Sequence, residues 1–261
     1  MKVVIFCGGR GTRLSGADGK SLPKPLVRIG YRPMLWHVMK YYAHFGHKDF
    51  ILCLGNSAEL IKEYFLNYHE WVSNNFTLTD GGKTVDLETE DIGDWHITFV
   101  DTGLRSNVGE RLKAVEPYLR DEEIFLANYA DGLTDLDLSR QVETLRTSGK
   151  VGCFLAVKPS QSFHVVRFGE DNVVSDISPV RDANVIINGG YFVFRRSIFD
   201  YIKQGEELVH EPFARLIRER QLLAYPYENF WSMDTFKDQV ELTEMYERGN
   251  PPWAVWEEDH S

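Results

Sequence analysis

The chain has few cysteines and no long apolar run. Its 261 residues include three cysteines, Cys7, Cys53 and Cys153, and none has the spacing of a Cys-X-X-Cys metal or redox motif. Because each lies in a short apolar stretch, we expect buried free thiols, which are typical of a reducing compartment. No segment approaches the roughly 20 apolar residues of a membrane-spanning helix, and the apolar run at residues 3–7 is too short for a signal peptide. These absences predict a cytoplasmic protein without a membrane partner.

Positive charge is scarce overall, with 29 Lys and Arg residues against 39 Asp and Glu and a formal net charge of −10. This balance argues against a nucleic-acid partner. Residues 1–40 are the exception, because they hold eight Lys and Arg residues and a single acid, Asp18. We therefore expect this segment to bind a small polyanion.

The order of apolar patterns indicates an α/β fold. Short buried runs at residues 3–7 and 50–54 alternate with a helical pattern at residues 33–45 and with a second helix that Ser57 can cap. Strands that alternate with helices form a parallel sheet with helices on its faces. The sequence shows no linker, so we predict one domain over residues 1–261.

Two segments interrupt this alternation. Residues 74–90 and 163–177 alternate apolar and polar residues around turns that contain glycine, which is typical of exposed hairpins inserted into a core fold. The first hairpin and the tryptophan-bearing tail from Pro251 onward are candidate contacts of a homo-oligomer. The alternative is that they form a lid or simply extend the fold.

A glycine-rich loop follows the first apolar run. It consists of Gly8, Gly9, Arg10, Gly11, Thr12 and Arg13. A strand that ends in glycines presents backbone N–H groups that can hold a phosphate. The loop matches neither the Rossmann fingerprint nor the P-loop, because Leu14 stands where each motif requires a glycine. We interpret it as a nucleotide-phosphate site, with a plain tight turn as the alternative.

Lys24 lies between Pro23 and Pro25, eleven residues after Arg13. The prolines restrict the backbone on both sides of the lysine. A rigidly placed cation can stabilise the charge on a phosphate under attack. Lys24 and Arg13 are therefore the candidate catalytic cations.

Asp131 and Asp234 are the candidate metal ligands. Asp131 follows the apolar run at residues 124–128, and open α/β sheets bind ligands beyond the ends of their strands. Asp234 also follows a short strand pattern, so the two carboxylates could converge on one cation. Mg²⁺ takes one or two protein carboxylates beside substrate phosphates. The alternative for Asp131 is an ordinary Asp-Gly turn.

With these motifs, the chain resembles the sugar-1-phosphate nucleotidylyltransferases, and within them the glucose-1-phosphate cytidylyltransferase subgroup. The matching segments extend over nearly the whole length. They are residues 8–14, 23–25, 35–40, 61–65, 99–103, 111–113, 130–132, 187–190, 231–235 and 249–253.

The resemblance implies a Rossmann-like mixed, mostly parallel sheet with helices on both faces. It implies transfer of CMP from CTP to a phosphorylated acceptor, such as the sugar 1-phosphate glucose 1-phosphate, with release of pyrophosphate. It also implies Mg²⁺ as the cofactor, held by Asp131 and Asp234, and Lys24 on the α-phosphate or on the incoming phosphate. The nucleotide-binding residues that it implies are Gly8, Gly9, Gly11, Thr12, Arg13, Thr102, Gly103 and Arg111, and the acceptor-binding residues are Asn188 and Gly189.

The acceptor half departs from the family pattern. The family carries Glu-Lys-Pro before the Asn-Gly-Gly strand, and its lysine contacts the sugar phosphate; residues 176–179 here read Asp-Ile-Ser-Pro. We expect Arg181 to supply the missing cation. The change leaves a different small phosphorylated metabolite open as the acceptor. A third reading is a homologue that binds nucleotide without turnover, and the presence of Arg13, Lys24, Asp131 and Asp234 argues against it.

Overall fold

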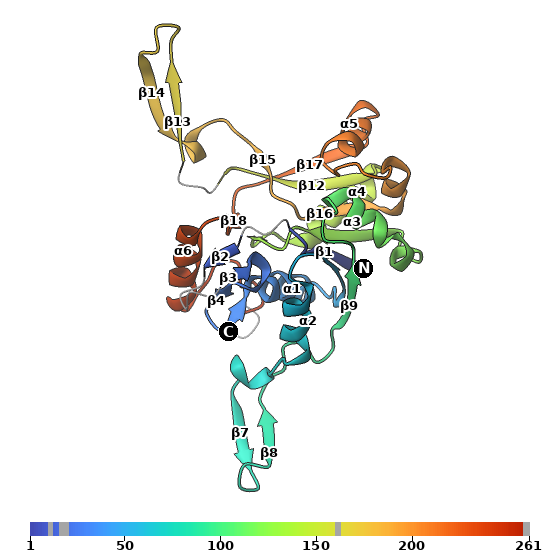
Figure 1. Cartoon of the computed structure of the whole chain (residues 1–261), viewed down its shortest axis with the longest axis vertical. Coiled ribbons are helices and arrows are strands. Elements are labelled where there is room, and N and C mark those ends of the chain that lie inside the picture. Colours follow the sequence, from blue (N-terminus) through green and yellow to red (C-terminus); the bar gives the residue numbers. More distant parts are fainter. Residues whose placement is uncertain (10–12, 16–20, 160–162, 258–261) are drawn as a thin grey trace.

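An eight-stranded mixed sheet forms the centre of the protein in a computed structural model (Figure 1). The structure describes residues 1–9, 13–15, 21–159 and 163–257, and for residues 13–15, Ser21 and Arg181 it describes the main chain alone. The strands of the sheet are β1 (Lys2–Phe6), β6 (Asp49–Leu54), β9 (His96–Asp101), β10 (Ile124–Asn128), β12 (Gly152–Val157), β15 (Ile187–Asn188), β16 (Phe192–Arg195) and β17 (Leu222–Tyr227). Their order is β15-β12-β16-β10-β1-β6-β9, and β17 pairs with β12.

Most neighbouring strands of this sheet run parallel. β1 is parallel to β6 and β10, β6 is parallel to β9, and β12 is parallel to β17. β16 is antiparallel to both β10 and β12, and β15 is antiparallel to β12. The carboxyl ends of β1, β6, β9, β10 and β12 therefore meet at one edge of the sheet. The predicted mixed, mostly parallel sheet is confirmed.

Helices cover both faces of the sheet, as expected. They are α1 (Met34–His44), α2 (Ala58–Leu66), α3 (Val108–Ala114), α4 (Leu138–Ser148), α5 (Glu211–Arg218) and α6 (Phe236–Glu247). Side chains of α1, α2, α4 and α6 join one hydrophobic cluster, and side chains of α3 and α5 join the other. No helix in the described part of the chain is long and apolar enough to cross a bilayer.

β1 shows why the sheet carries two helical layers. Val3 and Ile5 pack into the cluster that contains α1, whereas Val4 and Phe6 pack into the cluster that contains α3. Successive side chains of a strand point to opposite faces, so an unbroken apolar run is buried only when both faces are covered. Burying each such side chain stabilises the fold by about 1.5–3 kcal/mol. The three cysteines are also buried and free, as the sequence predicts.

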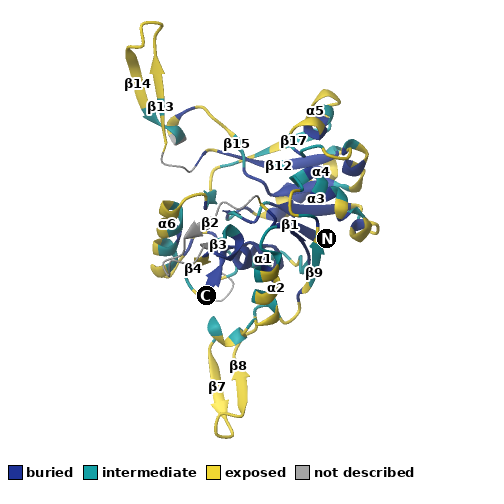
Figure 2. Ribbon diagram, viewed as in Figure 1, coloured by how far each residue is buried: buried dark blue, intermediate teal, exposed yellow. Residues whose placement is uncertain are grey.

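Two hairpins project from opposite ends of this body (Figure 1). One pairs β7 (Phe76–Thr79) with β8 (Thr84–Leu87), and the other pairs β13 (His164–Phe168) with β14 (Val174–Pro179). Figure 2 shows that both are largely exposed. The two predicted inserted hairpins are therefore confirmed.

The remaining elements are short strand pairs and 3₁₀ turns outside the central sheet. They are the strand pairs β2 (Arg13–Ser15) with β3 (Ser21–Pro23), β4 (Arg28–Ile29) with β5 (Arg32–Pro33), and β11 (Gly132–Leu133) with β18 (Trp231–Ser232). The 3₁₀ turns are η1 (Lys24–Leu26), η2 (Glu70–Val72), η3 (Glu116–Leu119), η4 (Val180–Asp182) and η5 (Arg196–Tyr201).

Candidate active site

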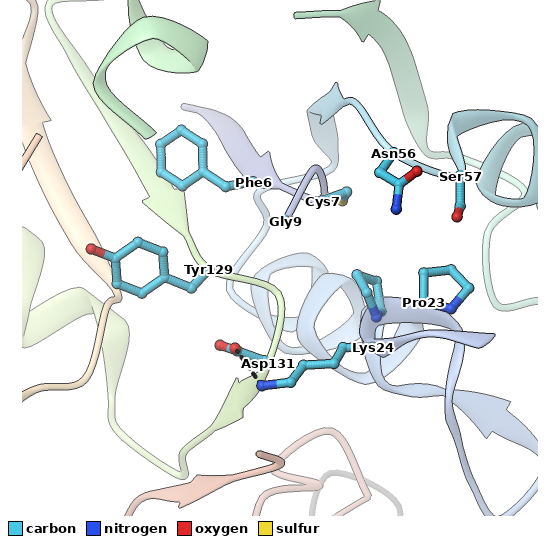
Figure 3. Close-up of a pocket in the computed structure, with 10 residues that line it drawn as sticks. Phe6, Cys7, Gly9, Pro23, Lys24, Asn56, Ser57, Tyr129 and Asp131 are labelled. Atoms are coloured by element: carbon cyan, nitrogen blue, oxygen red, sulfur yellow. Dashed lines mark ion pairs between the residues drawn. The ribbon is translucent and has the colours of Figure 1, made fainter. Parts of the chain in front are cut away.

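A pocket opens at the edge where the parallel strands end (Figure 3). Residues after β1, β6 and β10 line it together with the segment that contains Lys24. The lining residues are Phe6, Cys7, Gly9, Pro23, Lys24, Pro25, Asn56, Ser57, Tyr129 and Asp131. The pocket therefore joins the glycine-rich loop, the proline-flanked lysine and Asp131, as expected for ligand binding at the carboxyl ends of strands.

Lys24 lies between the two carboxylates that the sequence singles out. Its Nζ is 2.7 Å from Oδ1 of Asp234 and 3.9 Å from Oδ2 of Asp131. The lysine begins η1 and accepts a hydrogen bond at its carbonyl from the Val27 N–H. The structure thus brings together three charged residues that are more than 100 positions apart in the sequence.

Local backbone contacts fix the positions of the two carboxylates. Asp131 follows Ala130, whose φ of 66° is left-handed, and the Asn128 side chain accepts a hydrogen bond from the Ala130 N–H. The Met233 N–H donates to the Asp131 carbonyl and extends the pairing of β11 with β18. Asp234 is therefore held beside Asp131 by main-chain pairing.

Asp238 fixes the other side of Asp234. Its carboxylate accepts hydrogen bonds from the N–H groups of Asp234 and Thr235, at 2.9 and 2.8 Å. Thr235 in turn caps the first turn of α6. Residues 234–238 therefore both begin α6 and hold the Asp234 carboxylate beside Lys24.

The charge balance of this cluster favours an added cation. Burial raises the pKa of Asp131 to about 6, the Lys24 ammonium opposes the shift, and the Asp234 carboxylate adds to it. The Asp131 side chain is still 36% exposed, so a ligand can reach it. Two carboxylates beside one lysine thus form a site in which more positive charge is favourable.

The donor set fits a magnesium ion bound together with phosphate. Mg²⁺ prefers oxygen ligands and uses one or two carboxylates, with water and substrate phosphates completing its shell. Within the described residues, no group of three or more His, Cys, Asp or Glu side chains forms a metal site. Asp131 and Asp234 would therefore hold such an ion only in part, and a bound phosphate would supply further ligands.

Arg111 lies beneath the loops rather than in the pocket lining. Its side chain is buried, and its Nη1 donates hydrogen bonds to the Leu54 carbonyl at 2.9 Å and to Thr102 Oγ1 at 2.6 Å. A Cβ on Gly8 would lie 2.3 Å from the guanidinium, and a Cβ on Gly55 would lie 2.7 Å from it. Arg111 thus connects the chain segments that leave β1, β6 and β9, and the absence of side chains at both glycines makes room for it.

We expect Arg111→Met to destabilise the fold by about 3 kcal/mol, because it removes two buried hydrogen bonds from a charged donor, to the Leu54 carbonyl and to Thr102 Oγ1. Urea unfolding measures the loss. Arg146→Met is the matched control: Arg146 forms an exposed ion pair with Glu143 on α4, and its removal changes stability by about 0.5 kcal/mol or less. A loss below about 1 kcal/mol for Arg111→Met would contradict the structural role.

The other predicted nucleotide contacts fall into two groups. Gly8, Gly9, Thr102 and Gly103 lie at or beside the sheet edge, and Thr102 Oγ1 also donates to the Leu54 carbonyl at 2.7 Å. Gly11, Thr12 and the side chain of Arg13 lie outside the described residues. Their roles stay predictions.

The predicted acceptor residues Asn188 and Gly189 do not line the pocket, although Asn188 contacts Tyr129, which does. The Asn188 amide donates to the Tyr129 hydroxyl at 3.4 Å, and the Gly189 N–H donates to the Leu155 carbonyl. Arg181 lies in η4, at the base of the projecting β13–β14 hairpin, and its side chain is outside the described part. Ser178, which stands in place of the family's lysine, belongs to that hairpin as well.

Sequence reasoning missed three pocket residues: Asn56, Ser57 and Tyr129. Tyr129 could have been found, because it directly follows β10 and precedes Asp131 by two positions. Ser57 occupies the N-cap position of α2, as expected, but its side chain makes no capping hydrogen bond and its backbone is left-handed, with φ of 58°. Ser57 also lines the pocket.

Comparison with known proteins shows the family. A family model described as nucleotidyl transferase matches residues 2–235. The chain belongs to the nucleotidyl transferase family. This nucleotidyl transferase is 38% identical over 259 residues to the glucose-1-phosphate cytidylyltransferase of Salmonella typhimurium. The alignment covers 98% of this chain and 100% of that relative. The chain is 37% identical over 263 residues to the probable glucose-1-phosphate cytidylyltransferase of Bacillus subtilis, with the same coverage.

Solved structures share the fold of this nucleotidyl transferase. HddC from Yersinia pseudotuberculosis aligns with a TM-score of 0.63 at 18% identity, covering 94% of this chain and 99% of that one. A UDP-glucose pyrophosphorylase complexed with UDP-glucose aligns with a TM-score of 0.66 at 14% identity, covering 95% and 98%. These likenesses support the Rossmann-like architecture, and the family resemblance seen in the sequence is confirmed.

Proposed function

We propose that this nucleotidyl transferase moves CMP from CTP to a sugar 1-phosphate, with glucose 1-phosphate as the expected acceptor, and releases pyrophosphate. The observation that carries the proposal is Lys24, held between Asp131 and Asp234 in a pocket beside the glycine-rich loop. The two relatives above carry the name glucose-1-phosphate cytidylyltransferase and match this chain over their whole length.

The reaction needs charge placement more than proton transfer. The second pKa of a phosphate monoester is near about 6, so the acceptor phosphate is mostly ionised at pH 7. One of its oxygens attacks the α-phosphorus of CTP, the bond from the α-phosphorus to the bridging oxygen of the β-phosphate breaks, and pyrophosphate leaves with that oxygen. The protein must hold two anions in line and stabilise the charge on the transferring group.

Lys24 can perform this task directly. Its side chain is 17% exposed and lines the pocket, where the ammonium can bind the α-phosphate or the incoming phosphate. Arg13 is the second expected cation, on the departing pyrophosphate. Asp131 and Asp234 would hold Mg²⁺, which adds positive charge to the phosphates when bound.

A pyrophosphate-release assay tests the proposal. It combines Mg²⁺, each of the four NTPs, and a panel of acceptors that includes glucose 1-phosphate, mannose 1-phosphate and glycerol 3-phosphate. We expect release with CTP and glucose 1-phosphate, and loss of release when EDTA removes the metal. Release with UTP or dTTP but not CTP would contradict the cytidylyl assignment, and no release with any pair would overturn catalysis.

The acceptor side of the reaction involves residues at the projecting β13–β14 hairpin. Ser178 and Arg181 belong to a hairpin region that projects from the body in this structure. If glycerol 3-phosphate is used and no sugar 1-phosphate is, the acceptor is a smaller metabolite. The homo-oligomer and the cytoplasmic location expected from the sequence stay predictions.

A further inference from the structure

The main chain before and at Asp131 is held by hydrogen bonds. The Ala130 N–H donates to Asn128 Oδ1 at 3.0 Å, and the Asp131 carbonyl accepts from the Met233 N–H. The proposed reaction uses the Asp131 carboxylate, and a functional side chain must be held within about 0.5 Å of its working position. The chain that follows Asp131 therefore needs support as well.

Tyr191 supplies this support. Its hydroxyl donates to the carbonyl of Gly132, the residue after Asp131, at 2.9 Å. Gly132 is buried, and a buried carbonyl that has lost its partner is unfavourable. Tyr191 is itself only 1% exposed, so water does not compete for this bond. Both residues that flank Asp131 are thus fixed by hydrogen bonds.

The position of Tyr191 is fixed as well. Its φ is 48°, which is left-handed and unfavourable for a residue with a large side chain. Such conformations persist where the surrounding structure enforces them. Here Gln141 Nε2 donates to the Tyr191 carbonyl at 2.7 Å, and the Tyr191 ring packs against the rings of Tyr41 and Tyr42. The hydroxyl therefore acts from a rigid position.

Tyr191 also connects Asp131 to the predicted acceptor segment. It directly follows residues 188–190, the Asn-Gly-Gly segment to which acceptor binding is assigned by resemblance. Its bonding partner, Gly132, is 59 positions away in the sequence. This single hydrogen bond thus joins the end of the acceptor segment to the turn that carries the carboxylate.

We infer that Tyr191 is a positioning residue, which holds Asp131 in register with the acceptor segment. This inference rests on the proposed function and extends it to a residue outside the pocket lining. Transfer requires the acceptor phosphate and the α-phosphate to be aligned, and a displacement of about 1 Å can lower the rate about 100-fold. Tyr191 acts through Asp131 and not on the substrate itself.

Tyr191→Phe tests this role, because it removes the hydroxyl and retains the ring. Isothermal titration calorimetry without acceptor measures binding of the Mg²⁺–CTP complex and, in EDTA, of CTP alone. We expect the variant to bind Mg²⁺–CTP about fivefold more weakly than the wild type, in line with the loss of one hydrogen bond. Binding of CTP alone should stay within about twofold. At saturating Mg²⁺, kcat should fall about tenfold.

Tyr41→Phe is the matched control. Tyr41 is also 1% exposed, its ring contacts that of Tyr191, and its hydroxyl donates to another main-chain carbonyl, that of Leu136, at 2.7 Å. The two variants should lose a similar amount of thermal stability, about 2–4 °C in melting temperature. Tyr41→Phe should keep Mg²⁺–CTP affinity and kcat within about twofold, because its hydrogen bond does not hold a neighbour of Asp131.

The titrations do not depend on turnover, so the two proposals can fail separately. If Tyr191→Phe loses no more Mg²⁺–CTP affinity than Tyr41→Phe does, the inference is overturned while the proposed reaction stands. If the expected difference is found but the wild type releases no pyrophosphate, the reaction alone is refuted. A wild type that binds CTP equally well with and without Mg²⁺ would also overturn the inference, because Asp131 would then hold no metal.

Discussion

Lys24→Met should lower kcat by about 100- to 1000-fold. Methionine keeps much of the length of the side chain but removes the charge, and loss of one group that stabilises transition-state charge typically costs this much. The effect should be largest on kcat, because the lysine acts on charge that develops during transfer. Steady-state pyrophosphate release with CTP and glucose 1-phosphate measures it.

Lys48→Met is the control for this prediction. Lys48 also forms an ion pair with a carboxylate, Asp94, but both side chains are well exposed and lie outside the pocket lining. This variant should keep kcat within about twofold. If Lys24→Met retained more than a tenth of the wild-type kcat, Lys24 would not carry the role proposed for it.

Asp131→Asn should nearly abolish turnover and at the same time stabilise the metal-free protein. The amide cannot replace the carboxylate as a ligand for Mg²⁺, so we expect kcat to fall at least about 100-fold. Stability changes in the other direction, because burial disfavours the ionised carboxylate and raises the pKa of Asp131 to about 6. Without metal, the asparagine avoids that cost.

The pH dependence gives this second effect its sign. Between the ordinary pKa of 3.8 and the folded value of about 6, the folded state binds more protons at Asp131 than the unfolded state does. The contribution of Asp131 to the free energy of unfolding therefore falls as the pH rises through that window. The stability gain of Asp131→Asn should be larger at pH 7.5 than at pH 4.5.

Urea unfolding in EDTA at the two pH values measures this gain. Asp94→Asn, at the exposed ion pair with Lys48, serves as the control and should show little change between them. Added Mg²⁺ and CTP should stabilise the wild type and not Asp131→Asn. A gain for Asp131→Asn that is smaller at pH 7.5 than at pH 4.5 would contradict the raised pKa.

The residues at the carboxyl edge of the sheet can be predicted from the sequence, because each strand ends where a short apolar run ends. The apolar runs that become β1, β6 and β10 are bounded by Gly8, Gly55 and Tyr129, so the side chains that follow them can be expected at one edge. This reasoning predicts the position of Asp131, which follows β10. The proximity of Asp234 depends on pairing of β11 with β18, two strands of two residues each, and such short pairing has no distinctive sequence pattern.

Arg111 and Ser57 show what the sequence does not reveal. The family resemblance implies that Arg111 lies near the nucleotide, but it gives no sign that the guanidinium contacts the Leu54 carbonyl, Thr102 Oγ1 and two glycines. Its burial depends on two glycines that are 47 positions apart, Gly8 and Gly55. Ser57 stands at the N-cap of α2, as the sequence predicts, but neither its left-handed backbone nor the absence of a capping hydrogen bond could be read from the sequence.

The Lys24–Asp234 ion pair also has a consequence for folding. It connects residues 210 positions apart, and a hydrogen bond from the Gln239 side chain to the Arg28 carbonyl spans 211. Contacts between such distant residues raise the contact order of the fold, which slows folding. A nascent chain therefore cannot assemble these charges until its last helix, α6, has emerged and docked. The charged cluster proposed for catalysis thus also holds the segment around Lys24 against the segment that begins α6.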